Sequence, residues 1–398
     1  MVQAPAPIYL DHAATTPLCA AARDALQACL AAPLGNPSSP HGPGQAAAEW
    51  IDAAARRLAG VIGAQPEEIV WTSGATEATN LALRGVAEFA ARGHKGAARP
   101  AHIISCETEH SATRDTLKAL AERGTRITWL GVDEQGRIDL AELDAALDEA
   151  SDLVSLMHVN NETGLIHDIP AVAEICQRRG VPLHVDACQS LTRLPIDVAA
   201  TPIALMSMSA HKIGGPPGVG ALYVRRRPRV GLAPQIIGGG QQKGRRAGTL
   251  ATHQIAAFGV AAETAAAERE TQQARYRGLS ERLWQGLSAI DGVTANHAAG
   301  EDRAAPFVNV SVAGVHGEAL RAGLAYGAPN IALSGGSACS AARGASSYVL
   351  RAMGRTPAAA AASLRLTLGP EIDEAIIDTT IARIAAEITR LRRIAGQA

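Results

Sequence analysis

The chain has 398 residues, of which 47% are hydrophobic and 19% are charged, which is the balance of a folded globular protein. Its formal net charge is -1 and its sequence pI is about 6.9, so no nucleic acid and no membrane surface is expected as a partner. The six cysteines show neither a CxxC pair nor metal-ligand spacing, so we predict no disulfide framework and no bound metal.

The N-terminal residues have neither the positive charge nor the apolar core of a signal peptide. No apolar run along the chain is long enough to span a bilayer. With no disulfide framework either, the sequence predicts a cytoplasmic protein.

Short apolar segments alternate with amphipathic helical patterns between about residues 55 and 224. This alternation is typical of an α/β fold with a mainly parallel sheet covered by helices. Seven strands are predicted, near residues 69–72, 102–106, 126–130, 153–159, 182–186, 203–209 and 219–224.

The rest of the chain has a different pattern. A long alanine- and glutamate-rich helix is predicted over about residues 253–290, and short strands follow near 307–312, 331–334 and 363–368. We expect a second, smaller α+β domain. The predicted division gives residues 16–261 to a large domain and residues 1–15 and 262–398 to the small one.

A candidate phosphate site follows the first predicted strand, where residues 73–77 (SGATE) open a helix with apolar periodicity. Free backbone N–H groups there, with the Thr76 hydroxyl and the helix dipole, are suited to bind a phosphate. The same residues are also those of an ordinary capped helix, and taken alone they favour that simpler interpretation.

Two more apolar segments end in polar side chains at the carboxyl end of a predicted strand, where open α/β sheets bind ligands. An imidazole at His110 is suited to stack on an aromatic ring and to move protons near neutral pH, or simply to cap the next helix. The amides of Asn160 and Asn161 are suited to bind a ligand or a substrate carboxylate, although paired asparagines before a glycine often form only a turn.

An aspartate and a lysine complete the pattern. Asp186 ends a predicted buried strand, and Lys212 lies in the segment SAHK, followed by a glycine- and proline-rich run. Residues placed in this way suit a pyridoxal phosphate enzyme, in which a lysine holds the aldehyde as an imine and an aspartate pairs with the pyridinium nitrogen. Each alone favours a structural role, and the segments around Thr76, His110 and Asn161 shift the balance towards the cofactor.

Cys339 lies in a run of small residues, 334–344, which contains no large apolar neighbour to bury it. Its thiol becomes nucleophilic when ionised, and the local sequence balances a catalytic role evenly against a structural one. Four other cysteines are predicted to be buried as small hydrophobic residues: Cys29, Cys106, Cys176 and Cys188.

Taken together, these motifs resemble the cysteine desulfurases of the NifS and IscS type, over nearly the whole chain. The resemblance runs from residues 8–17 through 35–39 to 363–369. It implies a pyridoxal phosphate-dependent transferase of fold type I that acts as a homodimer, with active sites at the subunit interface. It also implies removal of sulfur from L-cysteine to give L-alanine and a persulfide on Cys339, which passes to a sulfur-acceptor protein.

The resemblance further assigns roles to individual residues. Lys212 is implied to hold the cofactor, Asp186 to pair with its ring nitrogen, Gln189 to contact its ring oxygen and His110 to stack on the ring. The residues implied to hold the phosphate are Ala75, Thr76, Ser209 and His211, with Thr249 reaching it from the neighbouring subunit. Asn161 and Arg365 are implied to hold the ring and the substrate carboxylate, and Cys339, Lys212 and His110 are the implied catalytic residues.

Two other functions stay open. One keeps the cofactor and changes the chemistry, as in a selenocysteine lyase or another aminotransferase-like enzyme. The other is a catalytically silent relative that needs only the fold, which the joint presence of Lys212, Asp186, His110, Cys339 and Arg365 argues against. No motif identifies the acceptor of the sulfur.

Overall fold

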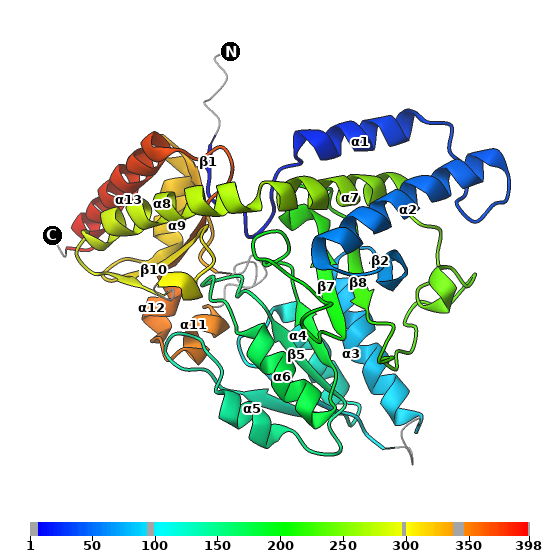
Figure 1. Cartoon of the computed structure of the whole chain (residues 1–398). Coiled ribbons are helices and arrows are strands. Elements are labelled where there is room, and N and C mark those ends of the chain that lie inside the picture. Colours follow the sequence, from blue (N-terminus) through cyan, green and yellow to red (C-terminus); the bar gives the residue numbers. More distant parts are fainter. Residues whose placement is uncertain (1–6, 94–98, 297–299, 337–345, 397–398) are drawn as a thin grey trace.

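The computed structural model describes residues 7–93, 99–296, 300–336 and 346–396. A larger lobe is built around a central sheet, and a smaller lobe contains both a strand from the N-terminal segment and the C-terminal helix (Figure 1). No helix in these ranges is long and apolar enough to cross a membrane.

The larger lobe has a seven-stranded sheet in the order β2-β8-β7-β6-β5-β3-β4. Neighbouring strands from β7 to β4 are parallel, and β8 is antiparallel to both β2 and β7. The strands are β2 (Ile69–Thr72), β3 (His102–Cys106), β4 (Arg126–Leu130), β5 (Leu153–Met157), β6 (Leu183–Asp186), β7 (Leu205–Ser209) and β8 (Gly220–Val224). All seven predicted strands are therefore present, and the predicted α/β fold with a mainly parallel sheet is confirmed.

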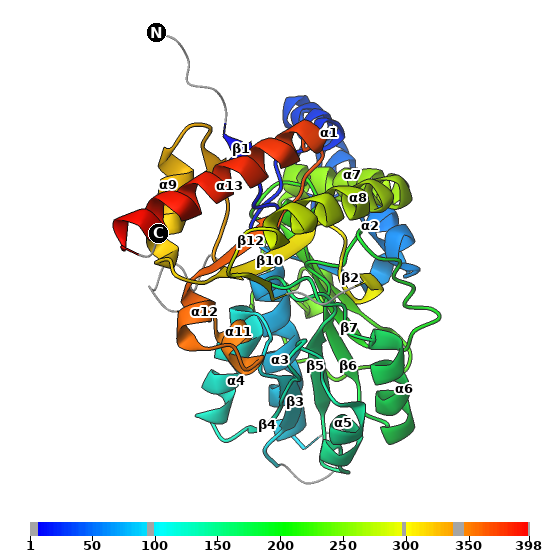
Figure 2. The ribbon, with the colours of Figure 1, turned by 90° about the vertical axis from the view of Figure 1, so that its left-hand side faces the viewer.

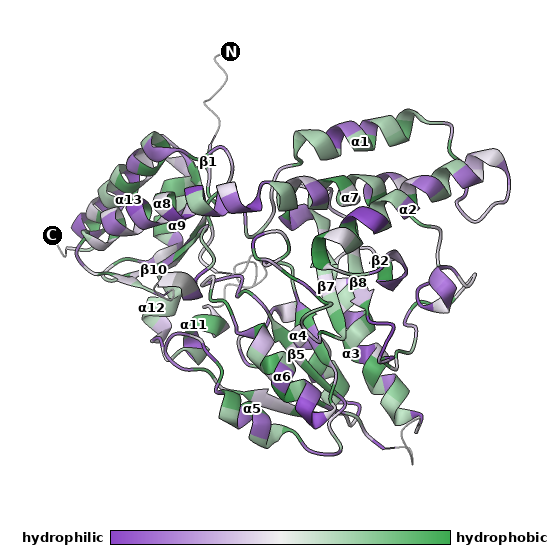
Figure 3. Cartoon of the chain, in the orientation of Figure 1, coloured by the Kyte–Doolittle hydropathy of each residue, from purple (hydrophilic) through white to green (hydrophobic). Residues whose placement is uncertain are grey.

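Helices cover both faces of this sheet. Successive side chains of a strand point to opposite faces: on β3, Ile104 and Cys106 pack into one apolar core and Ile103 into the other. The first core is covered by α2 (Gly42–Ile62), α5 (Leu140–Ala146), α6 (Ile169–Arg179) and α7 (Thr252–Ala267), and the second by α3 (Ala75–Ala91) and α4 (Ser111–Ala121) (Figure 2). Six of the seven strands are buried along their whole length, which explains why they are mainly apolar (Figure 3), whereas the edge strand β4 is partly exposed.

The long predicted helix over residues 253–290 is two helices, α7 and α8 (Arg269–Ser288), so the prediction of a single helix was wrong. Glu268 separates them with φ -88° and ψ -6°, which interrupts the helical hydrogen bonds but keeps the chain in nearly the same direction (Figure 1). α7 packs against α2 and α1 (Ala20–Ala31) in the larger lobe, whereas α8 packs against α13 (Glu374–Ile394) in the smaller one.

The smaller lobe has its own sheets and its own core. Strands β9 (Val293–Ala295), β10 (Phe307–Val312) and β12 (Ser363–Thr367) form an antiparallel sheet with β10 in the middle, and β1 (Ile8–Tyr9) pairs in parallel with β11 (Ile331–Ala332). The remaining helices are α9 (Gly317–Tyr326), α11 (Tyr348–Ala352) and α12 (Pro357–Ala361). The core of this lobe draws on Leu10 and on residues 279–388. We propose residues 1–15 and 262–398 as the small domain, with Ala262 itself packing into the core of the larger lobe.

One close contact in the larger lobe gives a stability prediction. A Cβ on Gly220, at the start of β8, would lie 2.6 Å from the Gly74 carbonyl carbon and 2.7 Å from the Met208 carbonyl oxygen. We expect Gly220→Ala to lower the free energy of unfolding by about 2–3 kcal/mol, because main-chain atoms would have to move.

The matched control is Gly60→Ala on α2, where an added Cβ meets nothing within 4 Å. It should raise the free energy of unfolding by about 0.5–1 kcal/mol, because alanine favours helix more than glycine does. Urea denaturation measures both variants, and equal stabilities would show that the contact at Gly220 is unimportant.

Candidate active site

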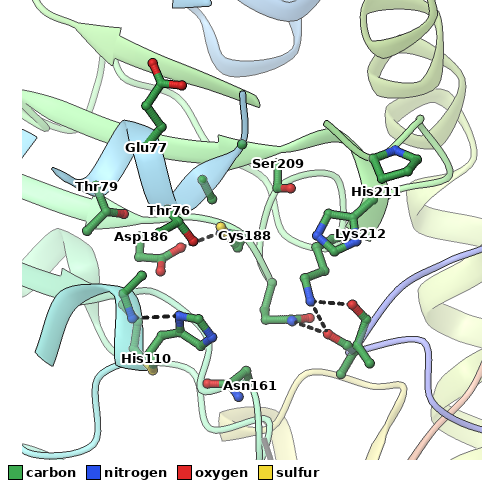
Figure 4. A pocket seen from close by; sticks show the side chains of 18 of the residues that line it. Thr76, Glu77, Thr79, His110, Asn161, Asp186, Cys188, Ser209, His211 and Lys212 are labelled. Atoms are coloured by element: carbon green, nitrogen blue, oxygen red, sulfur yellow. Dashed lines mark hydrogen bonds between the residues drawn. The ribbon is translucent and has the colours of Figure 1, made fainter. Parts of the chain in front are cut away.

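A cavity of about 420 Å³ lies at the carboxyl ends of the central parallel strands, the usual ligand position in an open α/β sheet (Figure 4). Asp186 is the last residue of β6 and Ser209 the last of β7, while His110 follows β3 and Asn161 follows β5. Ten of the sequence-predicted site residues line it: Ala75, Thr76, His110, Asn161, Asp186, Gln189, Ser209, His211, Lys212 and Arg365.

The amino end of α3 forms one wall of the cavity, through residues 73–77. The Glu77 carboxylate accepts a hydrogen bond from Ser73 N at 2.8 Å and two from the Arg246 guanidinium, at 2.7 and 3.0 Å. Burial opposes ionisation of Glu77, but the hydrogen bonds from Arg246 and Ser73 outweigh it and lower the pKa of Glu77. Arg246, which the sequence analysis missed, therefore neutralises the Glu77 carboxylate in the first turn of α3. With that negative charge balanced, the amino end of the helix is suited to bind an anion.

His110 caps the next helix, which is one of the two predicted roles, and it also lies at the cavity, where the other role would place it. In the cap on α4, its Nδ1 accepts a hydrogen bond from Ala112 N at 3.1 Å. Burial lowers the pKa of His110, although the Asp186 carboxylate partly opposes this. A neutral imidazole that accepts at Nδ1 carries its proton on Nε2. His110 is thus a neutral group with one N–H to donate.

Lys212 lies in the short 3-10 turn Ala210–Lys212 that follows β7. Its Nζ donates hydrogen bonds to the carbonyl oxygens of Ala13 and Ala14, at 2.7 and 2.6 Å (Figure 4). Burial lowers the pKa of Lys212 to about 8, and the nearby guanidinium of Arg365 adds to this. An amine with a pKa near neutrality is suited to act as a nucleophile and as a general base.

Arg365 projects from β12 and is only 1% exposed. Its guanidinium donates to the Asn161 carbonyl at 2.9 Å and to the Asp11 carboxylate at 2.6 Å. Arg365 Nε and Asn161 Oδ1 are buried and have no hydrogen-bond partner among the described residues. Because buried polar groups are usually paired, these two atoms fit a polar ligand beside them, and the planar guanidinium suits a carboxylate. Asp11 had no signal in the sequence that would have identified it as the partner of Arg365.

Two predicted site residues are missing from the described lining of the cavity, for different reasons. Thr249 is exposed and does not line the cavity, and Cys339 lies outside the described residues. Cys29 and Cys176 are buried, as predicted, and so is Cys106.

The prediction for Cys188 was wrong. Its side chain is only partly buried and lines the cavity, because the chain turns after β6 and Cys188 N donates to the Asp186 carboxylate at 2.9 Å. Burial, together with the Asp186 charge, raises the pKa of Cys188 well above its usual range, so this thiol stays protonated.

Comparison with known proteins places this site in a family. Residues 8–375 match the aminotransferase class-V family. The cysteine desulfurase IscS of Proteus mirabilis is 45% identical over 97% of this chain and 94% of its own length. Among solved structures, a NifS-like protein is 31% identical with a TM-score of 0.88, covering 97% of this chain and 100% of the other. SspA in complex with cysteine is also 31% identical, with a TM-score of 0.78 over 91% of this chain and 99% of SspA. The chain therefore belongs to the class-V aminotransferase family and, within it, to the pyridoxal phosphate-dependent cysteine desulfurases.

Proposed function

We propose that this enzyme removes sulfur from L-cysteine, releases L-alanine and holds the sulfur as a persulfide on Cys339 for an acceptor protein. The observation that carries the proposal is that Lys212, Asp186, His110 and Arg365 line one cavity. The 45% identity to a cysteine desulfurase supports the same chemistry.

The residues around the cavity fit pyridoxal phosphate. The Asp186 carboxylate suits the ring nitrogen, and the neutral His110 imidazole suits the ring face. The phosphate fits the amino end of α3 together with Ser209 and His211. When bound, this cofactor supplies an aldehyde that binds amines and a ring that takes up the electrons of the substrate Cα.

Each residue then has a defined task. Arg365 holds the substrate carboxylate, which fixes the bond of the substrate Cα that faces the ring. Lys212 would hold the cofactor aldehyde, and its amine, when free, would take the proton from the substrate Cα. His110, with its N–H on Nε2, assists by hydrogen bonding the return of a proton to the carbon that becomes the alanine methyl group.

Cys339 supplies the nucleophile. Its thiolate attacks the substrate sulfur, so that an S–S bond forms while the C–S bond breaks and its electron pair stays on carbon. Protonation of that carbon, together with return of a proton from Lys212 to the Cα, gives L-alanine. The net reaction converts L-cysteine and the Cys339 thiol into L-alanine and the Cys339 persulfide.

The test is Cys339→Ser. After incubation with L-cysteine we expect no extra sulfur atom on the variant by mass spectrometry and no sulfide release, with an unchanged absorption spectrum of the bound cofactor. Cys19→Ser, which removes a half-buried thiol that does not line this cavity, is the control and should still form the persulfide. Undiminished sulfide release by Cys339→Ser would refute the role of Cys339, and turnover of L-selenocysteine alone would favour a selenocysteine lyase.

We also propose that the enzyme is a homodimer. Ile237 is 86% exposed and Ile236 is 40% exposed, in the same segment between β8 and α7 that contains Thr249. Large apolar side chains exposed side by side support a subunit contact, which would bring Thr249 to the phosphate of the other subunit.

Ile237→Glu should therefore shift the protein from dimer to monomer at micromolar concentration. Light scattering coupled to gel filtration measures the mass. Ile394→Glu, at an exposed position near the end of α13, is the control and should leave the dimer intact. If wild-type protein is monomeric, the proposal fails.

A cytoplasmic location is proposed as well. All five described cysteines are free thiols, which supports a reducing compartment.

A further inference from the structure

Arg193 is a partly buried arginine that forms no ion pair with any carboxylate in the described part of the chain. Its guanidinium donates to the main-chain oxygen of Gln189 at 2.9 Å and to the side-chain oxygen of Gln189 at 2.8 Å. It also donates to the Lys212 carbonyl at 3.3 Å. Burial lowers the pKa of Arg193 to about 10. Burying the Arg193 charge without a counter-ion is unfavourable. We therefore ask what the hydrogen bonds of Arg193 to Gln189 and Lys212 do at the cavity.

The first consequence concerns the amide of Gln189. Its Oε1 accepts from Arg193 and its Nε2 donates to the Ala13 carbonyl at 2.9 Å. If the amide were rotated by half a turn, its N–H₂ group would face the N–H groups of Arg193, and two donors would meet. Arg193 therefore fixes Gln189 as a donor on the cavity side, which is the orientation needed to bind the ring oxygen of the cofactor.

The second consequence concerns Lys212. Arg193 holds the main-chain oxygen of this lysine, and Thr16 donates to the same oxygen at 3.2 Å. The charge of Arg193 also opposes protonation of the lysine amine, as Arg365 does, whereas Cys188 and Asp11 favour it. The other titratable groups at this cavity are His110, Asp186, His211 and Glu77.

The backbone next to Arg193 is strained, as is common where a side chain has to be held in a fixed position. Thr192 has φ +68°, in the left-handed region that is unfavourable for a β-branched residue. Such conformations persist where the surrounding structure holds them, and they are common near functional sites. Here the strained residue directly precedes the side chain that joins Gln189 to Lys212.

We propose that Arg193 is a positioning residue of the cofactor site, which orients Gln189 as a hydrogen-bond donor and holds Lys212 in place through its main chain. The proposal rests on the proposed function only in that the cavity binds pyridoxal phosphate. It assigns Arg193 no contact with the substrate.

The test compares Arg193→Gln and Arg193→Lys in the holoenzyme without substrate. The first readout is the pH midpoint of the spectral change of the bound cofactor, and the second is the dissociation constant of the cofactor. Arg193→Gln loses the charge and the forked contact, so its midpoint should rise by about 0.5–1 pH unit and cofactor binding should weaken about tenfold. Arg193→Lys keeps the charge, so only cofactor binding should weaken.

The matched control is Arg225→Gln. Arg225 also donates only to main-chain oxygens, those of Ile203, Thr201 and Val198, and it follows the end of β8 that lies away from the cavity. This variant should lower thermal stability and move neither readout. If Arg193→Gln and Arg225→Gln give the same midpoint and the same dissociation constant, the proposal is overturned.

Failure of this inference is distinguishable from failure of the proposed function. A shifted midpoint in Arg193→Gln with no sulfur on Cys339 of the wild-type enzyme would overturn the desulfurase proposal alone. Normal persulfide formation in the wild type with an unmoved midpoint in Arg193→Gln would overturn the role of Arg193 alone. If Arg193→Gln does not fold, Arg193→Lys supplies the decisive dissociation constant, and wild-type affinity in that variant would overturn the role of the fork.

Discussion

Replacement of Lys212 with alanine is expected to lower the turnover of L-cysteine at least about 10⁴-fold. The substitution removes the amine that we propose holds the cofactor and takes the Cα proton, and no second lysine lines the cavity in the described part of the chain. L-alanine formation under saturating cofactor measures the effect. Lys118→Ala, at an exposed position on α4, is the control and should keep wild-type turnover.

The pH dependence gives a second check on Lys212. Only the neutral amine accepts a proton, and burial lowers the pKa of Lys212 to about 8. The rate of proton removal should therefore rise with pH up to about pH 8 and level off above it. In Lys212→Ala, added ethylamine should restore part of the activity. The rise of the rate with pH should then move to higher pH, towards the pKa of free ethylamine. Turnover in Lys212→Ala without added amine would show that Lys212 is not the base.

Replacement of Arg365 with glutamine should lower kcat/KM for L-cysteine by about 10²–10³-fold. Arg365 is almost fully buried and is the only arginine that lines the cavity in the described ranges, so no other guanidinium takes over the substrate carboxylate. The variant also leaves the Asp11 carboxylate without its 2.6 Å partner, so we expect a lower melting temperature. Arg365→Lys keeps the positive charge but loses the planar guanidinium that binds a carboxylate through two hydrogen bonds. Its activity should lie between that of the wild type and that of Arg365→Gln.

Two inhibitors, L-alanine and ethylamine, distinguish a loss of carboxylate binding in Arg365→Gln from a general distortion of the cavity. L-alanine carries the carboxylate and ethylamine does not, and both compete with the substrate through their amines. Arg365→Gln should weaken inhibition by L-alanine about 100-fold and leave inhibition by ethylamine unchanged. Equal weakening of both would mean that Arg365 acts on the shape of the cavity and not on the carboxylate.

Much of the fold was predictable because burial leaves a local pattern. Except for the edge strand β4, the strands of the main sheet are buried on both faces, so each is a short, mainly apolar segment between helical patterns. Polar residues that directly follow such segments, such as His110 and Asp186, fall at the carboxyl edge of a parallel sheet whatever the order of the strands. Cavity-lining residues of this kind were therefore predictable from position alone.

The sequence by itself determined the strands, the parallel α/β class and the residue types that suit pyridoxal phosphate. Only the tertiary structure decided the partners of these residues: Asp11 for Arg365, 354 positions away; the Ala13 and Ala14 carbonyls for Lys212; and Arg193 for Gln189. The physical reason is that burial follows a period along the chain, whereas a hydrogen bond depends on distance and angle between groups that the folded chain brings together. The partial exposure of Cys188 and the interruption at Glu268 depend on the same three-dimensional packing.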